Sequence, residues 1–210
     1  MSFSDDPFVP QPDEAGLTGS LQGRFLIAMP SMEDSRFART VIYMCSHSAE
    51  GAMGLVINKP SDQITFVDLM EQLSIETEAR TIPSIPILAG GPVDGGRGFV
   101  LHSPEYDGAN STIQVGNGVR LTATTDVIRA IADGDGPHDK LVALGYAGWE
   151  AGQLEAEIKA NGWLVSDAEP VTPTTSLHGT RTSQLFSQPG QACPVSPDSK
   201  DGSTPSVASA

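Results

Sequence analysis

Short apolar runs separated by turn residues predict a strand-rich fold. Residues 24–29, 40–45 and 52–58 are rich in β-branched, aromatic and other apolar side chains, and proline, glycine or charged residues bound each run. Because the links between them are short, we expect these three strands to form an antiparallel meander. Further strands are predicted over residues 85–89, 97–102, 140–146 and 163–165, and a hairpin over residues 111–115 and 119–124.

Three segments carry apolar residues at helical spacing. Thr65 and Asp68 suit a capping box at the start of the first, and Gly134 suits the left-handed position after the second. A turn at Gly148 is expected to lead into the third. Mostly antiparallel strands with helices on the outside indicate the α+β class. The helices are predicted over residues 65–74, 125–133 and 151–160.

The composition divides the chain of 210 residues into three parts. Residues 1–17 are acidic and interrupted by prolines, which predicts a flexible lead. Residues 18–168 carry the periodic segments and are predicted to form one α+β domain. Residues 169–210 are rich in serine, threonine and proline and predict a disordered tail, because such a segment buries too little apolar surface to offset its ordering entropy.

The charge and cysteine content exclude several classes of function. The formal net charge is −14, which makes direct binding to a nucleic-acid backbone unfavourable. No apolar run is long enough to span a membrane, so no membrane partner is expected. Two cysteines make neither a disulfide scaffold nor a cysteine-rich zinc module, and no targeting segment is recognised at the N-terminus. We therefore expect a cytoplasmic protein that carries no metal and no cofactor.

Three polar clusters have both a chemical and a structural interpretation. Cys45, His47 and His102 offer zinc ligands or a nucleophile with its base, although a thiol in the core and a histidine in a turn are the favoured interpretation. The loop of Glu33, Asp34, Arg36 and Arg39 offers paired carboxylates but is typical of a solvated surface with ion pairs. The glycine-rich segment 90–98 offers Arg97 to an anion, yet it precedes a strand rather than a helix, so a tight structural turn is favoured.

A fourth cluster lies where strands are predicted to end. The segment Gly145-Tyr146-Ala147-Gly148-Trp149 joins a predicted strand to a predicted helix, a position at which sheet proteins often bind ligands. Asn58 and Lys59 close another strand, and Gln153 begins the helix. If these ends converge they form a cleft, whereas the alternative is that Trp149 and Tyr146 only close one end of the core.

Several motifs in order resemble the AlgH/YqgE family. They are residues 21–30 (LQGRFLIAMP), 51–60 (GAMGLVINKP), 90–93 (GGPV), 97–102 (RGFVLH), 144–149 (LGYAGW), 152–155 (GQLE) and 161–163 (NGW). The resemblance covers roughly residues 17–168. It implies a compact α+β fold with a small barrel or bifurcated sheet and flanking helices. It does not imply an activity, because none is established for the family. Some members are labelled transcriptional regulators after a link to alginate control, and the residues give no support to direct DNA binding.

The C-terminal part departs from the resemblance. Similar chains continue after Trp163 with a further strand, an amphipathic helix and a short Gly-His-Ala ending, whereas nothing of that kind follows Pro170 here. We hypothesise that the ending has diverged or was replaced through a frame shift or a sequence error. An exposed apolar patch is then predicted where the missing helix would pack.

The leading functional hypothesis is a cytoplasmic binding or regulatory module with a cleft for a small molecule. In it, Lys59 holds an anionic group and Trp149 stacks on a flat one. One alternative is an enzyme that acts on a small metabolite with His102 as acid or base. The sequence identifies no other catalytic residue for it. Another is an indirect transcriptional regulator that works through a protein partner. The predicted ligand-binding residues are Asn58, Lys59, Arg97, His102, Tyr146, Trp149 and Gln153.

Overall fold

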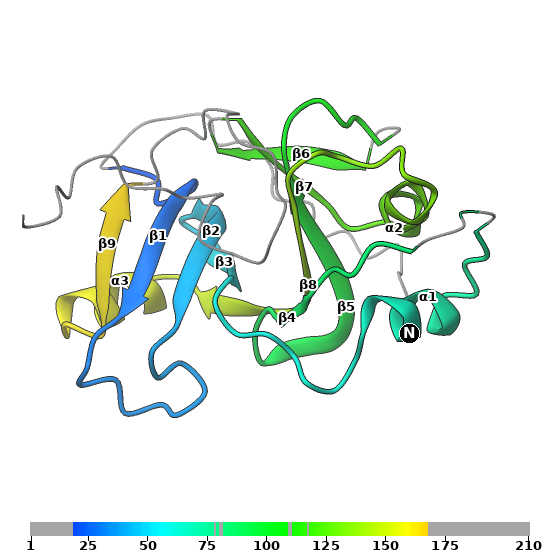
Figure 1. The fold of residues 1–210 in the computed structure, drawn as a ribbon. Helices are drawn as coiled ribbons and strands as arrows, with labels where there is room; N and C mark the ends of the chain where they lie inside the picture. Colours follow the sequence, from blue (N-terminus) through cyan, green and yellow to red (C-terminus); the bar gives the residue numbers. More distant parts are fainter. Residues whose placement is uncertain (1–18, 78, 80–81, 109–110, 117, 168–210) are drawn as a thin grey trace, which may run out of the picture.

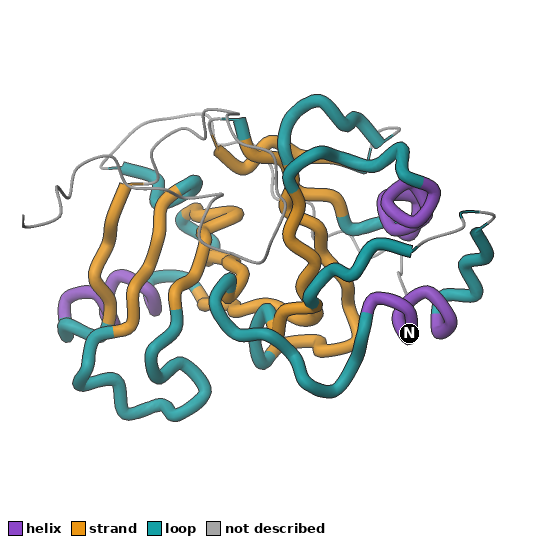
Figure 2. The backbone as a smooth tube through the Cα atoms, in the orientation of Figure 1, coloured by secondary structure: helices purple, strands orange, loops and turns teal. Residues whose placement is uncertain are grey.

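A curled sheet with helices around it makes up the part of the chain that the structure describes (Figure 1). This computed structural model describes residues 19–77, 79, 82–108, 111–116 and 118–167. The predicted acidic lead and the predicted serine- and proline-rich tail lie outside the described residues. Figure 2 shows the strands in the centre of the molecule and the helices at its periphery, as expected for the α+β class.

All the predicted strands are present, and the expected meander of the first three is confirmed. Within the described residues the order across the sheet is β6-β7-β5-β8-β3-β2-β1-β9, and β4 pairs separately with β8. Every pairing is antiparallel except that of β4 with β8. The strands are β1 (Arg24–Ala28), β2 (Val41–Ser48), β3 (Gly51–Val56), β4 (Ile87–Ala89), β5 (Val93–His102), β6 (Thr112–Gly116), β7 (Val119–Thr122), β8 (Lys140–Glu150) and β9 (Trp163–Asp167).

The sheet divides along β8, which explains the bifurcated form. The first half of β8 pairs with β5 on one side and β4 on the other, and its second half pairs with β3. Gly145 lies between the two halves with φ of 73°, a conformation that favours glycine. The predicted turn at Gly148 was wrong, because Gly148 lies inside β8 opposite Met53 of β3. Pairing to β3 holds this segment extended and overrides the local preference of glycine for a turn.

The two ends of the sheet curl toward each other and form a half-barrel. Nε2 of Gln22, just before β1, donates to the carbonyl oxygen of Gln114 in β6 (3.2 Å). A Cβ added at Gly23 would lie 3.2 Å from the Cα of Gly116, so these two backbones pass in close contact. Glycine at both positions therefore allows β6 to close against the start of β1.

The helices lie where the apolar periodicity predicted them: α1 (Phe66–Gln72), α2 (Thr125–Asp133) and α3 (Gln153–Lys159). The expected capping box is confirmed, since the Thr65 hydroxyl accepts from the Asp68 N–H and the Asp68 carboxylate accepts from the Thr65 N–H. Gly134 adopts the left-handed conformation after α2, with φ of 91°. In Figure 1, α1 and α2 lie beside the β5 half of the sheet and α3 lies by β1 and β9.

The core consists of three clusters divided by the sheet. One lies inside the curl and includes Tyr43, Leu55 and Phe99. A second lies between the β5 half of the sheet and helices α1 and α2. The third contains Trp149, Leu154 and Trp163 and lies on the α3 side. Side chains that alternate along a strand therefore enter different clusters.

Candidate functional site

The predicted binding residues do not share one location. His102 is opposite Lys140, the first residue of β8, whereas Trp149 is opposite Ala52 near the other end of β8. Nine residue steps separate residue 140 from residue 149, which corresponds to roughly 30 Å along a strand. The register of β8 therefore separates the neighbourhood of His102 from that of Trp149.

Asn58 and Lys59 hold the loop between β1 and β2. Oδ1 of Asn58 accepts from the N–H of Val41 (2.9 Å), and its Nδ2 donates to the carbonyl oxygen of Arg39 (2.9 Å). Arg39 has φ of 58°, so Asn58 supports a left-handed residue at the end of the loop. Nζ of Lys59 donates to the carbonyl oxygen of Arg36 (2.9 Å). An ammonium has three N–H donors, which leaves two for another acceptor.

The charged loop before β2 contains one local ion pair. The Arg36 guanidinium donates to both carboxylate oxygens of Asp34, at 3.0 and 3.1 Å from Nε and 2.7 Å from Nη2. This pairing lowers the pKa of Asp34, and both side chains are exposed to solvent. Arg39 makes no ion pair with any residue in the described part of the chain. The loop thus has the ion-paired surface that the structural interpretation predicted.

Trp149 and Gln153 belong to an aromatic cluster built around one carboxylate. The Trp149 ring stacks on Phe37 with centroids 6.4 Å apart and meets Trp163 edge-on at 6.0 Å. The indole N–H groups of Trp149 and Trp163 both donate to Oε2 of Glu157, at 2.9 and 2.8 Å. Nε2 of Gln153 donates to Oε1 of Glu157 (2.9 Å). Trp149 is 7% exposed, so this ring lies within the protein.

Tyr146 and Arg97 meet over one core ring. The Tyr146 ring contacts Phe99 edge-on, with centroids 5.9 Å apart. The Arg97 guanidinium lies over the same Phe99 ring, 5.4 Å from its centroid, in cation–π geometry. The structure therefore brings these two predicted residues together, apart from the Trp149 cluster.

His102 is fully buried and bonded at both ring nitrogens. Nδ1 lies 2.8 Å from the carbonyl oxygen of Ser103, and Nε2 lies 2.8 Å from Oγ1 of Thr122. A carbonyl only accepts, so the bonding pattern places the ring proton on Nδ1 and makes Nε2 the acceptor from Thr122. Burial lowers the pKa of His102, more than the Ser103 carbonyl raises it. Burial therefore disfavours a charged ring, and His102 has no exposed surface.

The interpretation of Cys45 as a core thiol is confirmed, whereas His47 lies within β2 rather than in a turn, and a β-bulge changes the face on which it lies. The β2–β3 register shifts between Met44 and Ser46, so Cys45 is an extra residue in the ladder. Cys45 lies in the cluster inside the curl, and its burial raises the pKa of the thiol. His47 bonds instead to Glu155 of α3, with Nε2 and Oε1 2.9 Å apart. Within the described residues no three Cys, His, Asp or Glu side chains are grouped as metal ligands.

The glycine-rich segment 90–98 begins as a close crossing of two backbones. A Cβ at Gly90 would collide with the carbonyl oxygen of Gly145, and one at Gly91 with the backbone of Tyr146. The N–H of Gly90 donates to the carbonyl oxygen of Leu144 (2.8 Å). This geometry supports the interpretation of a tight structural turn, because the glycines make room for β8.

An apolar row runs across the sheet to its last described strand. We define this edge row as Ile57, Val41, Ile27 and Leu164. Val41 is opposite Ile27, and Ile27 is opposite Leu164. The Ile57 N–H donates to the Val41 carbonyl oxygen (2.9 Å). The exposed fraction rises from 7% at Ile57 to 36% at Ile27 and 53% at Leu164, so the row ends as an exposed apolar pair.

Comparison with known proteins shows the family. The family model described as AlgH-like matches residues 25–192. The chain belongs to the AlgH-like family. It is 52% identical over 165 residues to a UPF0301 protein of Methylobacterium sp. (strain 4-46), covering 76% of this chain and 79% of that protein. It is 54% identical to a UPF0301 protein of Bradyrhizobium sp. (strain BTAi1 / ATCC BAA-1182), covering 75% and 76%.

Two solved structures share the fold. The solution structure of the AlgH protein from Pseudomonas aeruginosa matches with a TM-score of 0.61 and 44% identity, covering 75% of this chain and 82% of that one. A crystal structure of a Corynebacterium diphtheriae protein matches with a TM-score of 0.56 and 24% identity, covering 71% and 76%. The AlgH/YqgE resemblance predicted from the sequence is thus confirmed.

The family motifs have structural roles in this chain. Asn58 and Lys59 hold the loop before β2, Gly90 and Gly91 make room for β8, and Trp149 donates to Glu157. No described helix is both long enough and apolar enough to cross a membrane. The names of the relatives above state no activity.

Sequence reasoning missed three kinds of residue. Glu157 was not singled out, although its spacing of four from Gln153 places both on one helix face. Thr122 was not connected to His102, because that contact depends on the β5–β7 register. Ile27 and Leu164 lie in predicted strands, but their exposure depends on where the sheet ends.

Proposed function

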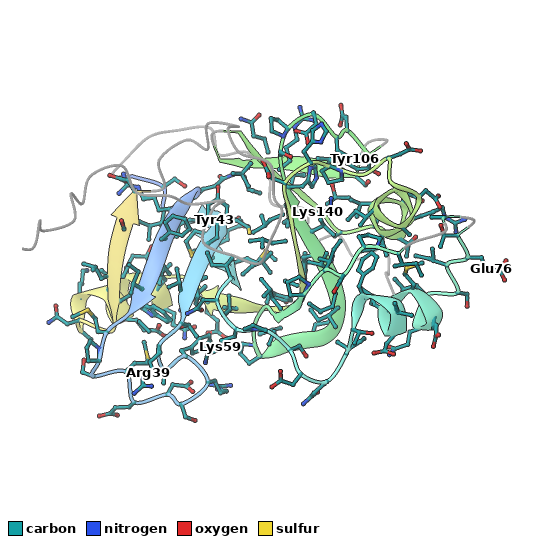
Figure 3. The ribbon with its side chains drawn as sticks, in the orientation of Figure 1. Arg39, Tyr43, Lys59, Glu76, Tyr106 and Lys140 are labelled. Atoms are coloured by element: carbon teal, nitrogen blue, oxygen red, sulfur yellow. The ribbon has the colours of Figure 1, made fainter. Side chains whose placement is uncertain are left out.

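We propose that this AlgH-like chain is a binding module for a small amphipathic anion, and that it regulates by binding rather than by catalysis. The observation that carries the proposal is the edge row, which ends as an exposed apolar pair and whose other members, Val41 and Ile57, lie two residues from the cations Arg39 and Lys59. Figure 3 draws Arg39 and Lys59 close together at the loop end of β1 and β2. The proposal retains the predicted role of Lys59 and moves the ligand away from Trp149.

The apolar body of the ligand would lie on Ile27 and Leu164. The two side chains are cross-strand partners, so they lie side by side on one face of the sheet. Their exposed fractions, 36% and 53%, leave apolar surface that a ligand can remove from water. Covering about half of a leucine side chain contributes about 1 kcal/mol. A hydrocarbon segment of several carbons therefore suits this surface.

The charged group of the ligand would lie against Arg39 and Lys59. Arg39 forms no ion pair within the described residues, and Lys59 retains two N–H donors after its bond to Arg36. Asn58 bonds the backbone at Val41 and at Arg39, which connects Arg39 to the edge row. The net charge of −14 opposes a polyanionic partner more strongly than a ligand with one or two negative charges.

The other two hypotheses have less support. An enzyme that uses His102 as acid or base needs a ring nitrogen within reach of substrate, whereas both nitrogens are bonded inside a fully buried site. A protein partner on the same face remains an outcome of the test below. A cytoplasmic location is part of the proposal.

The test is calorimetric titration of the full chain with decanoate and decyl phosphate below their micelle concentrations. We expect saturable binding near one ligand per chain, with hexanoate binding at least tenfold more weakly. Leu164→Ser and Lys59→Gln should each weaken binding at least fivefold. Their matched controls are Val67→Ser on α1, which also removes an exposed apolar side chain, and Arg129→Gln on α2.

The proposal fails if neither probe binds saturably, or if Leu164→Ser and Lys59→Gln bind as tightly as their controls. If decanoate and hexanoate bind with equal affinity, the contact with the apolar body is rejected but an anion site at Lys59 is retained. A dimer in sedimentation that dissociates in Leu164→Ser would assign the face to a second copy and refute the small-ligand proposal. Absence of both ligand binding and dimer would also refute it.

A further inference from the structure

We propose that the hydrogen-bond chain from His102 to Gly108 is a proton-responsive switch that connects the buried histidine to the start of α2. The proposal is independent of the ligand surface at the other end of the sheet. Figure 3 shows Tyr106 and Lys140, which border this region, by the β5–β8 half of the molecule and away from Lys59.

In the neutral state the donors of the chain run in one direction. Nδ1 of His102 donates to the Ser103 carbonyl, so Nε2 accepts from the Thr122 hydroxyl (2.8 Å). The Thr122 oxygen then accepts from the Thr112 hydroxyl, with the two oxygens 2.6 Å apart. Oγ1 of Thr112 accepts from the Gly108 N–H (3.2 Å). The hydroxyls of Thr122 and Thr112, the two in this hydrogen-bond chain, therefore each have a donor and an acceptor partner.

Protonation of His102 reverses that direction. A protonated Nε2 must donate to Thr122, which then turns its hydroxyl toward Thr112. The Thr112 hydroxyl is left to donate to the Gly108 carbonyl oxygen, now 3.5 Å away. The reversal therefore draws the Gly108 carbonyl toward Thr112, because 3.5 Å is longer than an ordinary O–H···O bond.

The Gly108 carbonyl is already occupied, so the reversal displaces a neighbour. It accepts from the backbone N–H of Ser111 (2.9 Å) and from the Ser111 hydroxyl (3.0 Å). The Ser111 hydroxyl has a second partner, Oγ1 of Thr124, at 3.1 Å. Thr124 is the N-cap of α2, and its side chain makes no capping bond. A third donor at Gly108 thus moves Ser111 toward the first turn of α2.

The charges around His102 act in opposite directions on its protonation. Burial and Arg120 of β7 oppose a positive charge on the ring, whereas Glu105 and Asp107 favour it. Lys140 of β8 is opposite His102, and burial lowers the pKa of Lys140. Further titratable groups in this region are Tyr106 after β5, His138 and Asp139 before β8, and Asp126 of α2.

The test is nuclear magnetic resonance of the ¹⁵N-labelled full chain between pH 8 and pH 5. Long-range imidazole spectra should show His102 as the neutral Nδ1–H form at pH 7.5, assigned by its loss in His102→Asn. As the pH falls, the backbone amides of Gly108 and Ser111 should shift with the midpoint of His102. In Thr112→Val the ring should still titrate, while those two amide shifts fall by at least half.

Two control measurements make the experiment decisive. Thr77→Val removes a threonine hydroxyl that bonds Asp133 and is not part of the hydrogen-bond chain from His102 to Gly108. It should leave the coupled amide shifts intact. A neutral Nε2–H form at pH 7.5 would overturn the proposal, and so would amide shifts that are unchanged in Thr112→Val. A chain that unfolds before His102 titrates overturns it as well, because the switch then has no folded protonated state.

Discussion

Glu157 holds the two tryptophans of the chain together, and its removal is the sharpest test of the α3 side of the fold. One carboxylate oxygen accepts both indole N–H groups, from Trp149 and Trp163, and the other accepts from Gln153. Glu157→Ala leaves both indoles without this acceptor. Glu157→Gln keeps an oxygen for the indoles but places a new N–H₂ donor against the Nε2 donor of Gln153.

The expected loss follows from the number of donors left unpaired. A buried donor without a partner costs about 1–3 kcal/mol, so two indole N–H groups cost about 2–6 kcal/mol. Glu157 is only half-buried, and water reaches the vacated position, so the lower part of this range applies. We expect Glu157→Ala to lower the free energy of unfolding by about 2–3 kcal/mol. Glu157→Gln should cost about 1 kcal/mol, because only the bond to Gln153 is lost.

The assay is equilibrium unfolding in urea followed by far-ultraviolet circular dichroism. With an m-value of about 2 kcal/mol/M, the midpoint for Glu157→Ala should fall by about 1 M. Tryptophan fluorescence of the native state should also shift to longer wavelength. The control is Glu150→Ala, an exposed acid whose carboxylate bonds no described residue, with an expected change below about 0.5 kcal/mol. Equal midpoints for the two alanine variants would refute the role of Glu157.

Three further predictions concern other parts of the fold. Gly145→Ala should lower the free energy of unfolding by about 2–4 kcal/mol in thermal unfolding, because its φ is 73° and a Cβ would lie 2.6 Å from the Gly91 carbonyl oxygen. The control is Gly134→Ala, where φ is 91° but the space is open, and it should cost only about 1 kcal/mol. Burial lowers the pKa of His102, so the folded chain binds fewer protons than the unfolded chain below about pH 6.5. The free energy of unfolding should therefore fall from pH 7.5 to pH 5.5. In His102→Asn this fall should be smaller. Burial raises the pKa of the Cys45 thiol. In a Cys193→Ser background, Cys45 should therefore resist a disulfide reagent at pH 8 until urea unfolds the chain. Rapid labelling of Cys45 in the native chain would contradict that burial.

Elements whose causes are local were predictable from the sequence. The capping box of Thr65 and Asp68, the left-handed Gly134 and the hairpin before α2 all depend on residues within four positions of one another. The length of β8 was not predictable from the sequence, because Gly148 favours a turn unless β3 pairs with it. The bulge at Cys45 was missed for the same reason, since it exists only in the pairing of β2 with β3.

The candidate site divides in the same way. The sequence identified Lys59 and His102 as unusual polar residues, and both make specific hydrogen bonds. It placed them in one cleft with Trp149, whereas the register of β8 sets His102 and Trp149 near opposite ends of that strand. Proximity between distant residues depends on strand register, and a shift of one residue changes both the partner and the face.

The sequence by itself determined the α+β class, the positions of the helices and strands, and membership in the AlgH-like family, because periodicity, turn residues and motif order are written along the chain. Only the tertiary structure decided that His102 is enclosed and bonded at both ring nitrogens, that Glu157 pairs the tryptophans, and that the edge row ends exposed. The physical reason is that burial and hydrogen bonding are properties of pairs of segments. The curl of the sheet, made where Gly23 meets Gly116 and where β8 bends at Gly145, sets which pairs form.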